Sequence, residues 1–293
     1  MDYLEANLEH EFLSRLYEPM SKLWSDAPPE KLWRIGELPE RSNNRLVVAM
    51  VGSRRCSNYG ATVAYETAKR LAQLDVIVVS GMAYGIDSYA HRGCIDGGGQ
   101  TVAVFGTPIN KIYPSSNYEL ARKIVEHGGA LLSEYEPGSE VRRQNFIYRN
   151  RIVSGLADVV IIVEAAERSG TFSTANYAAD QGRSVFVVPG DINRPGSLGT
   201  NRLIQAGASV FTSIEDMFLA LHSAWGVKLD KIRRKKPPKD PDGIIGLLEK
   251  GSETMDSLAE KLKMNVSELA AKLTMLEIDS YIKCDFVGNW SLV

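Results

Sequence analysis

Cysteine is rare in this 293-residue sequence, and its distribution argues against two kinds of structure. The three cysteines, Cys56, Cys94 and Cys284, are far apart and form no CxxC pair. An odd number of widely spaced cysteines predicts neither a disulfide framework nor a zinc site. We therefore expect reduced thiols and no bound metal.

Long apolar runs and N-terminal basic charge are also missing. Runs such as Val159–Val163 have the length of one strand, whereas a helix that spans a membrane needs about 18 apolar residues. The first eleven positions hold four acidic residues and no lysine or arginine, which is the wrong charge for a secretory or organellar signal. The sequence therefore predicts a cytoplasmic protein without a membrane partner.

Neither sign of charge is in excess overall, since the formal net charge is -2. Residues 46–220 hold sixteen basic and sixteen acidic side chains, whereas residues 221–242 hold seven basic and three acidic ones. A nucleic acid would therefore have to be bound by local clusters of positive charge rather than by a globally basic surface.

Residues 46–222 contain short apolar runs that alternate with segments of helical length. The runs are rich in β-branched residues and lack strict alternation, which is typical of strands buried on both faces. They are Leu46–Val51, Val76–Val79, Thr101–Phe105, Ala130–Leu132, Val159–Val163 and Val185–Val188. The segments between them include Ala61–Leu74, Tyr118–His127 and Thr174–Gly182. This order predicts an α/β fold with a Rossmann-like, doubly wound and mainly parallel sheet, which binds ligands beyond the carboxyl ends of its strands.

The regions on either side of the predicted sheet differ in character. Residues 1–45 are expected to form a short helical extension, because four apolar residues recur at four-residue spacing. These residues are Leu4, Leu8, Phe12 and Leu16. Residues 223–242 are basic and contain proline with little to bury, which predicts a linker.

Residues 243–293 predict a small winged-helix domain. Apolar residues at helical spacing indicate three short helices, and the third begins near Asn265 or Ser267 as N-cap. Two strands, Tyr281–Phe286 and Trp290–Val293, flank a Val-Gly-Asn turn as a terminal hairpin.

The loop after the first predicted strand contains Gly52, Ser53, Arg54 and Arg55. Glycine lets backbone amides approach an anion, a following helix N-terminus favours negative charge, and arginine donates in pairs to phosphate oxygens. The loop therefore predicts a phosphate-binding site. It matches neither GxGxxG nor GxxxxGK[ST], so dinucleotide cofactors and P-loop hydrolysis are not expected. The alternative is that Gly52 only permits a tight turn.

A second glycine loop follows the second predicted strand. Gly81 and Gly85 stand four residues apart beside a serine, an arrangement that suits binding of a phosphate or ribose by backbone amides. Asp87 is either a catalytic base or a residue that caps a helix and orients this loop. His91 is expected to be a structural histidine.

The segment from Phe146 to Arg151 combines aromatic and basic residues. Phe146, Arg149, Asn150 and Arg151 belong to the run Phe-Ile-Tyr-Arg-Asn-Arg, which combines two aromatic residues with two arginines. Bases stack on aromatic rings and phosphates pair with guanidinium groups, which suits an unpaired strand. The alternative is an amphipathic helix with solvated arginines.

The fifth predicted strand leads into Ser169, Gly170 and Thr171. The loops at the strand ends thus offer many backbone and hydroxyl donors but few groups that could transfer a proton. Such a site is typical of binding without catalysis.

Together these motifs resemble the DprA (Smf) family of DNA-processing proteins. They follow one another in the family's order over residues 46–220, and the similarity continues into the C-terminal segment. The motifs are VGSRRCSNYG, SGMAYGID, AHRG, GGGQTVAVFG, YPSSN, LLSEYEPG, FIYRNRI, VVIIVEA, SGTFSTA, QGRSVFVVPG and GTNRLIQAGA. The segment 1–45 is shorter than the N-terminal helical domain of many relatives.

The resemblance implies a non-catalytic homodimer that binds single-stranded DNA, protects it and loads the RecA recombinase during natural transformation. Arg54 corresponds to the arginine of the family's G-[ST]-R turn, and Phe146–Arg151 corresponds to its FPxRNR segment, with Ile147 in place of proline. The resemblance implies phosphate contacts from Arg54, Arg149 and Arg151 and a base contact from Phe146. Gly81, Gly85 and Asp87 correspond to the family's second glycine loop, and Asn150 belongs to the FPxRNR match. Ser169, Gly170 and Thr171 are weaker candidates for the same pocket.

Two other functions remain as alternatives. The sheet also resembles LOG nucleotide phosphoribohydrolases, whose PGGxGTxxE motif places a carboxylate where this sequence has Thr174. A hydroxyl cannot stabilise an oxocarbenium-like charge or activate water as a carboxylate does.

The other alternative is a transcription regulator that binds duplex DNA through the winged helix. Residues 243–293 hold five basic and eight acidic side chains, and the third helix offers only Lys272 against Glu268 and Glu277. Repulsion of phosphates predicts a protein-contact module instead.

Overall fold

The computed structural model describes residues 2–7, 10–14, 28–41, 45–167, 169–225, 242–278, 281–285 and 288–292. The chain divides into two compact units, Met1–Lys231 and Ile232–Val293. The predicted linker 223–242 lies almost entirely outside the described residues, so its boundaries stay a prediction. No helix of the described residues has the length and apolar character needed to cross a membrane.

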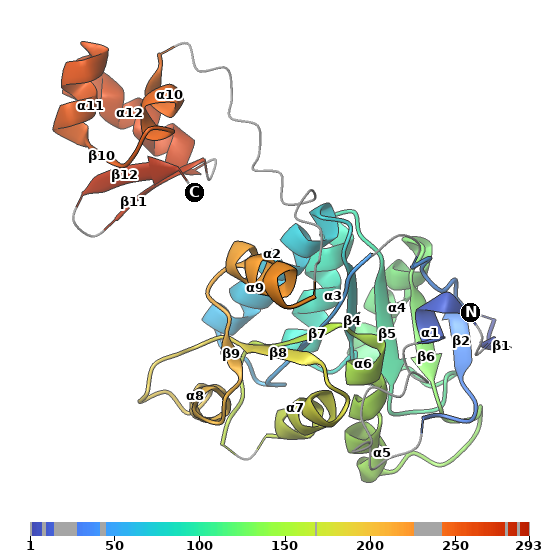
Figure 1. The fold of residues 1–293 in the computed structure, drawn as a ribbon. Coiled ribbons are helices and arrows are strands. Elements are labelled where there is room, and N and C mark those ends of the chain that lie inside the picture. The colour runs from blue at the N-terminus through green and yellow to red at the C-terminus, as the bar shows by residue number, and fades with distance from the viewer. Residues whose placement is uncertain are drawn as a thin grey trace. The chain divides into compact units, whose positions relative to one another are not determined.

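The first unit is built on one sheet of nine strands (Figure 1). The strands are β1 (Leu4–Glu5), β2 (Trp33–Gly36), β3 (Val47–Val51), β4 (Ile77–Ser80), β5 (Thr101–Phe105), β6 (Ala130–Ser133), β7 (Val159–Ile162), β8 (Ser184–Val187) and β9 (Ser209–Val210). Their order is β1-β2-β6-β5-β4-β3-β7-β8-β9. Strands β3 to β9 pair in parallel, and only β1 and β2 pair antiparallel. The predicted α/β fold with a mainly parallel sheet is therefore confirmed.

Helices connect the strands and cover both faces of the sheet. They are α2 (Asn58–Gln73), α3 (Ile86–Asp96), α4 (Tyr118–Glu126), α5 (Arg143–Tyr148), α6 (Asn150–Leu156), α7 (Thr171–Asp180), α8 (Leu198–Gln205) and α9 (Ile214–Trp225), with a 3-10 turn at Ser115–Asn117. Helices α6 and α7 pack on one face, whereas α3 and α4 pack on the other.

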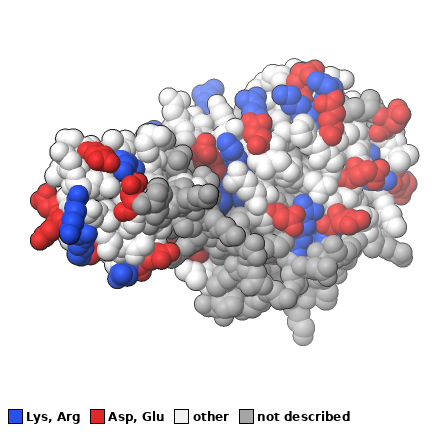
Figure 2. Space-filling view, turned by 90° about the horizontal axis from the view of Figure 1, so that it is seen from above, with Lys and Arg blue, Asp and Glu red and all other residues white. Residues whose placement is uncertain are grey.

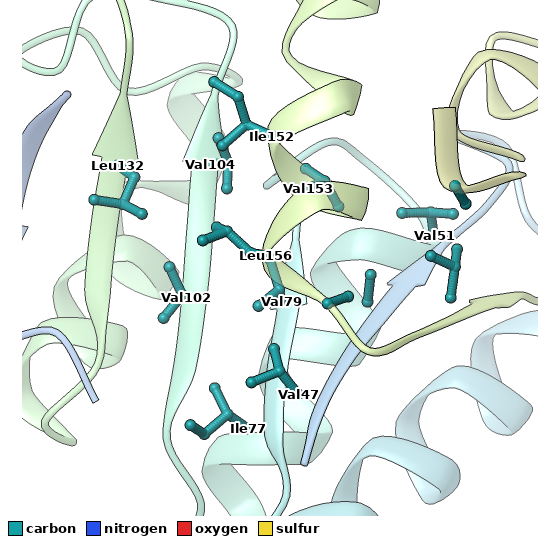
Figure 3. Close-up of a cluster of buried hydrophobic side chains, with 14 of the residues drawn as sticks. Val47, Val51, Ile77, Val79, Val102, Val104, Leu132, Ile152, Val153 and Leu156 are labelled. Carbon is teal, nitrogen blue, oxygen red and sulfur yellow. The ribbon is translucent and has the colours of Figure 1, made fainter. Parts of the chain in front are cut away.

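Alternate residues of the central strands β3 to β7 point to opposite faces, and both sets are buried. Val47 and Val51 pack with Ile152 and Leu156 of α6 (Figure 3). The intervening strand residues, such as Val48, have no exposed surface either. This double burial explains why the apolar runs show no alternation of apolar and polar residues.

The structure differs from the prediction in the N-terminal region. Leu4 lies in strand β1, paired with Arg34, and is not part of a helix. Phe12 lies in the short helix α1 (Glu11–Ser14) and is fully buried, whereas Leu8 and Leu16 fall outside the described residues. Strand β2 extends the sheet antiparallel to β6, with Ile35 opposite Leu131. Strands of two to four residues are too short to produce a period in the sequence, so the spacing of the apolar residues predicted a helix instead.

The second unit contains α10 (Ile244–Leu248), α11 (Met255–Leu262) and α12 (Val266–Ile278). Its strands β10 (Glu253–Thr254), β12 (Asn289–Leu292) and β11 (Ile282–Cys284) form an antiparallel sheet in that order. Its core includes Leu258, Leu273 and Trp290. Helices and a hairpin are found where the sequence predicted them, while the winged-helix assignment stays a prediction.

Candidate functional site

The carboxyl ends of the central strands show where a ligand would bind. From β3 the chain adds β4, β5 and β6 on one side, and then β7, β8 and β9 on the other. The strand order therefore reverses between β3 and β7, and open α/β sheets bind ligands beside such a reversal.

A small surface pocket lies where the loops after β3, β4 and β5 meet helix α5. Its lining is Arg54, Gly81, Ala83, Tyr84, Gly106, Tyr113, Pro114, Phe146 and Arg149, and we call it the aromatic pocket. It measures ≈ 30 Å³, whereas sites that enclose a small molecule measure about 300–1,000 Å³. Four residues predicted from three separate segments are thus brought together here: Arg54, Gly81, Phe146 and Arg149.

Aromatic rings and a free guanidinium group form the outer part of the aromatic pocket. The ring centroids of Tyr113 and Phe146 lie 5.3 Å apart at an interplanar angle of 55°. The guanidinium carbon of Arg54 lies 5.6 Å from the centre of the Phe146 ring. Tyr84 and Tyr113 are 50% and 51% exposed, and Arg54 is exposed and forms no ion pair with any described residue. A ligand would therefore meet accessible rings and an unneutralised positive charge.

Charge is otherwise mixed over the described surface. On the face shown in Figure 2, Lys and Arg alternate with Asp and Glu, and no large patch of one sign forms among the residues that are coloured. Attraction of a polyanion thus depends on local groups such as Arg54 and not on a field of the whole molecule.

Arg149 and Asp87 are buried beside the aromatic pocket, where both bind the backbone of Gly81, Arg149 at its carbonyl and Asp87 at its amide. Arg149 is 3% exposed, and its Nη1 donates to the carbonyls of Gly81, at 2.6 Å, and Val104. The carboxylate of Asp87 accepts from the amides of Gly81, at 3.1 Å, and Ala83, at 3.3 Å. Burial lowers the pKa of Arg149 to about 10, so the group stays charged at neutral pH. Burial raises the pKa of Asp87, and the charge of Arg149 opposes this shift.

These contacts favour a loop-orienting role for Asp87 over that of a catalytic base. Asp87 does not cap α3, because the N-cap is Gly85. Its carboxylate is engaged by the amides of its own loop, so it orients the glycine loop and is not presented to a ligand as a base. Arg149 lines the aromatic pocket while its Nη1 is committed to the backbone.

The glycines of the first two loops are needed for close packing between the loops. A Cβ on Gly85 would lie 2.3 Å from the carbonyl oxygen of Ser53, and its φ of +73° favours glycine. A Cβ on Gly52 would lie 2.7 Å from Ile86. A Cβ on Gly81 would lie 2.5 Å from the guanidinium group of Arg149. The geometry thus favours the tight-turn alternative for Gly52.

Arg151 does not reach the surface, contrary to the role that the resemblance implied. Its side chain is 1% exposed, forms an ion pair with Glu134 and lies 4.1 Å from the centre of the Tyr148 ring. It does not line the aromatic pocket. Because the sixth residue of the FIYRNR segment points into the protein, this arginine fixes α6 against β6 rather than contacting a phosphate.

The remaining predicted residues form a neighbouring group at the start of α7. Asn150 donates to Ser173 Oγ at 2.9 Å and to the carbonyl of Gly170 at 3.5 Å. Ser169 and Thr171 are joined through their hydroxyl oxygens at 2.8 Å. These residues lie outside the lining of the aromatic pocket, and their contact with a ligand stays a prediction. Ser53 accepts a hydrogen bond from the amide of Arg55 at 3.1 Å.

His91 is a buried neutral histidine. Its Nδ1 lies 2.7 Å from Thr101 Oγ1, which donates to the carbonyl of Val78 at 2.8 Å, so Nδ1 carries the proton. Burial, and to a lesser extent the charge of Arg149, lowers the pKa of His91 to about 3.

We expect His91 to make the protein less stable in acid. The unfolded chain binds a proton near the ordinary histidine pKa of about 6.5, whereas the folded chain binds it only near pH 3. Stability from this group is therefore complete above pH 6.5 and falls by about 1.4 kcal/mol per pH unit below it. Relative to His91→Asn, the wild type should lose about 2 kcal/mol between pH 6.5 and 5 in urea unfolding. The exposed His127→Asn is the control, and equal pH slopes for all three proteins would contradict the assignment.

Sequence reasoning missed three residues of this region. Tyr84 and Tyr113 line the aromatic pocket, and the signal for them was a tyrosine in a loop that follows a strand, within SGMAYGID and YPSSN. Glu164 follows β7 and is 4% exposed. Its Oε2 accepts from the amide of Ser57 at 2.8 Å, and its Oε1 accepts from the Ser57 hydroxyl. No sequence signal shows that this carboxylate turns inward.

Comparison with known proteins gives consistent results. Residues 11–222 match the model of the family described as DNA recombination-mediator protein A. Protein Smf from Escherichia coli (strain K12) is 36% identical over 278 residues, which are 92% of this chain and 73% of that protein. DNA processing protein A (DprA) from Streptococcus pneumoniae has a solved structure with a TM-score of 0.65 and 34% identity, over 75% of this chain and 74% of that one.

A structure of DNA processing protein A from Helicobacter pylori concerns the single-stranded DNA binding mode of that protein. It is 29% identical with a TM-score of 0.65, and it covers 76% of this chain and 97% of that chain.

Fold and pocket together define a Rossmann-like protein with an aromatic and cationic surface pocket at the carboxyl ends of its central strands. The chain belongs to the DNA recombination-mediator protein A family, the DprA/Smf proteins.

Proposed function

We propose that this chain binds single-stranded DNA at the aromatic pocket and acts there without catalysis. The observation that carries the proposal is the group of Tyr113, Phe146 and Arg54. The partly buried ring of Phe146 lies 5.3 Å from the Tyr113 ring and 5.6 Å from the guanidinium carbon of Arg54, which forms no ion pair with a described residue. Bases of an unpaired strand stack on such rings at about 1–3 kcal/mol each, and the guanidinium group pairs with a phosphate. The binding mode named for the Helicobacter pylori relative supports the same ligand.

The size of the aromatic pocket favours a strand that lies across the surface. At ≈ 30 Å³ it is far too small to enclose a nucleotide, so bases would stack on the rims of Tyr84 and Tyr113, which are half exposed. A duplex keeps its bases paired and offers no free ring faces, which explains a preference for single strands.

The titratable groups near the aromatic pocket support a protein that binds and does not catalyse. Asp87 is bonded to two amides of its own loop, and His91 is fully buried and neutral. Thr174, which stands where LOG enzymes have a carboxylate, is 2% exposed within α7. Among the described residues, no cluster of side chains could hold a metal ion.

The proposal extends to the role implied by the family. We propose a cytoplasmic homodimer that protects incoming single strands and loads the RecA recombinase on them in natural transformation. In the second unit, Lys272 of α12 forms ion pairs with Asp242, at 2.9 Å, and Glu268, at 2.7 Å. Its charge is thus compensated, which supports a protein-contact role for this unit rather than duplex binding.

Fluorescence anisotropy with oligo-dT, a duplex of equal length and a nucleoside monophosphate tests the proposal. We expect tight binding of oligo-dT that weakens with salt, with a slope near 0.7 for each neutralised phosphate, and weaker binding of the duplex. Release of base from the monophosphate would favour the LOG alternative. Preference for the duplex, lost on deletion of residues 243–293, would favour the regulator.

Loading of RecA is measured on the same oligonucleotide. We expect the lag before RecA hydrolyses ATP on single strands coated with a single-strand-binding protein to shorten when this chain is added. An unchanged lag at saturating concentrations would restrict the function to binding.

A further inference from the structure

The crevice between β3 and β7, where a fold of this type binds the phosphates of a nucleotide, is filled by a side chain of the protein itself. Glu164 comes from the end of β7, and its carboxylate lies at the N-terminus of α2. There Oε2 accepts from the amide of Ser57 at 2.8 Å, and Oε1 accepts from the Ser57 hydroxyl. Ser57 is the N-cap of α2.

The carboxylate takes the place that a phosphate takes in nucleotide-binding proteins of this architecture. A helix N-terminus at a switch point offers free amides and a positive dipole end, and these groups favour an anion. Here the anion is part of the chain. Its fit is close, because a Cβ on Gly60 would lie 2.5 Å from the Glu164 carboxyl carbon.

The backbone around Glu164 fixes the carboxylate in this position. The carbonyl of Glu164 accepts from the amide of Ser53 at 2.8 Å, and the next amide, of Ala165, donates to Gly196 at 2.9 Å. The residue is therefore anchored to the loop after β3 on one side and to the segment before α8 on the other, and its side chain is 4% exposed.

The carboxylate of Asp87 is bonded to backbone amides of the neighbouring loop in the same way. Its carboxylate accepts from the amides of Gly81 and Ala83, the backbone donors that a phosphate would otherwise use after β4. After β3 and β4, the amides of Ser57, Gly81 and Ala83 are thus already bonded to carboxylates of the protein.

We propose that Glu164, with Asp87 beside it, is a specificity-determining residue that excludes the phosphates of free nucleotides from the switch-point crevice. A phosphate of DNA then meets the exposed Arg54 at this edge of the sheet and not the crevice. The inference goes beyond the proposed function, since it concerns a ligand that the protein rejects and is measured without DNA.

Glu164→Ala and Glu164→Ser test the exclusion, because both remove the carboxylate and open the space it fills. We expect inorganic phosphate and AMP to stabilise these variants saturably, raising Tm by about 3–6 °C at ten times Kd. The wild type should show no saturable shift at matched ionic strength. Glu66→Ala, on an exposed position of the same helix, is the control and should behave as the wild type does.

Glu164→Gln tests whether phosphate is excluded because the side chain fills the space or because it is negatively charged. Its side chain fills the same space without a charge, so we expect it to exclude phosphate as the wild type does. If an opened variant is unfolded without phosphate, the same titration measures recovery of folded protein. Absence of stabilisation or recovery in both opened variants, or saturable AMP binding by the wild type, overturns the inference. Loss of oligo-dT binding by the wild type would overturn only the proposed function.

Discussion

Replacing Arg54 with alanine is expected to lower the affinity for oligo-dT about tenfold and to reduce the slope of log K against log[salt] by about 0.7. Arg54 is exposed and has no ion-pair partner among the described residues, so its charge is available to a phosphate without loss of an internal contact. Its position over the Phe146 ring also places that phosphate beside a stacked base. Anisotropy titrations at a series of salt concentrations measure both quantities.

Two further variants distinguish the loss of charge at Arg54 from the loss of stacking and from the loss of a positive charge elsewhere on the protein. Phe146→Leu should lower the affinity by a similar factor, since stacking is worth about 1–3 kcal/mol for each base, but it should leave the salt slope unchanged. Arg70→Ala is the matched control, because Arg70 lies in the last turn of α2, about 18 Å along that helix from its first residue, Asn58. Equal affinity for the wild type and both pocket variants would rule out the aromatic pocket as the DNA site.

The sheet could be predicted from the sequence because its central strands are buried on both faces. Such strands appear as continuous β-branched runs, and Thr101–Phe105 was predicted with the bounds that the structure shows. The strands β1, β2 and β9 escaped prediction. They have two to four residues, and their pairing depends on partners that are distant in the sequence. A local sequence pattern therefore cannot predict these strands.

The sequence predicted which loops form the candidate site, but not what each residue in these loops does. Parallel strands bring their carboxyl ends together, and so Arg54 and Phe146 could be placed at one edge from the sequence. Whether an arginine there points outward depends on packing that the sequence does not display. Arg149 and Arg151 both turn inward, Arg149 to the carbonyls of Gly81 and Val104 and Arg151 to Glu134.

The buried groups behind the aromatic pocket have a different task from the exposed ones. Arg54 and Tyr113 are available to a ligand, whereas Arg149 and Asp87 use hydrogen bonds to hold the loop that carries Tyr84. The rigid inner layer keeps the rings in place before DNA arrives, so less conformational freedom is lost on binding. Substitutions in the two layers should therefore have distinguishable effects, one on affinity and the other on folding.

Replacing Arg149 with methionine is expected to destabilise the first unit by about 3–5 kcal/mol, because it leaves a buried carboxylate without its nearby cation. The carbonyls of Gly81 and Val104 lose their donor as well. Urea unfolding followed by circular dichroism measures the loss. Arg143→Met, an exposed arginine at the start of α5, is the control and should change stability by less than about 0.5 kcal/mol.

The pH dependence of Arg149→Met identifies Asp87 as the cause. Burial already raises the pKa of Asp87, and Arg149 opposes that shift, so the variant should raise the pKa further. A carboxyl group with a raised folded pKa contributes stability at low pH and loses it as pH rises through that pKa. The deficit of Arg149→Met should therefore be smallest near pH 4 and grow toward pH 7. Asp87→Asn in the same background should remove this dependence and recover part of the stability, since an amide needs no compensating charge. A deficit that is constant with pH would assign the loss to the two carbonyls alone.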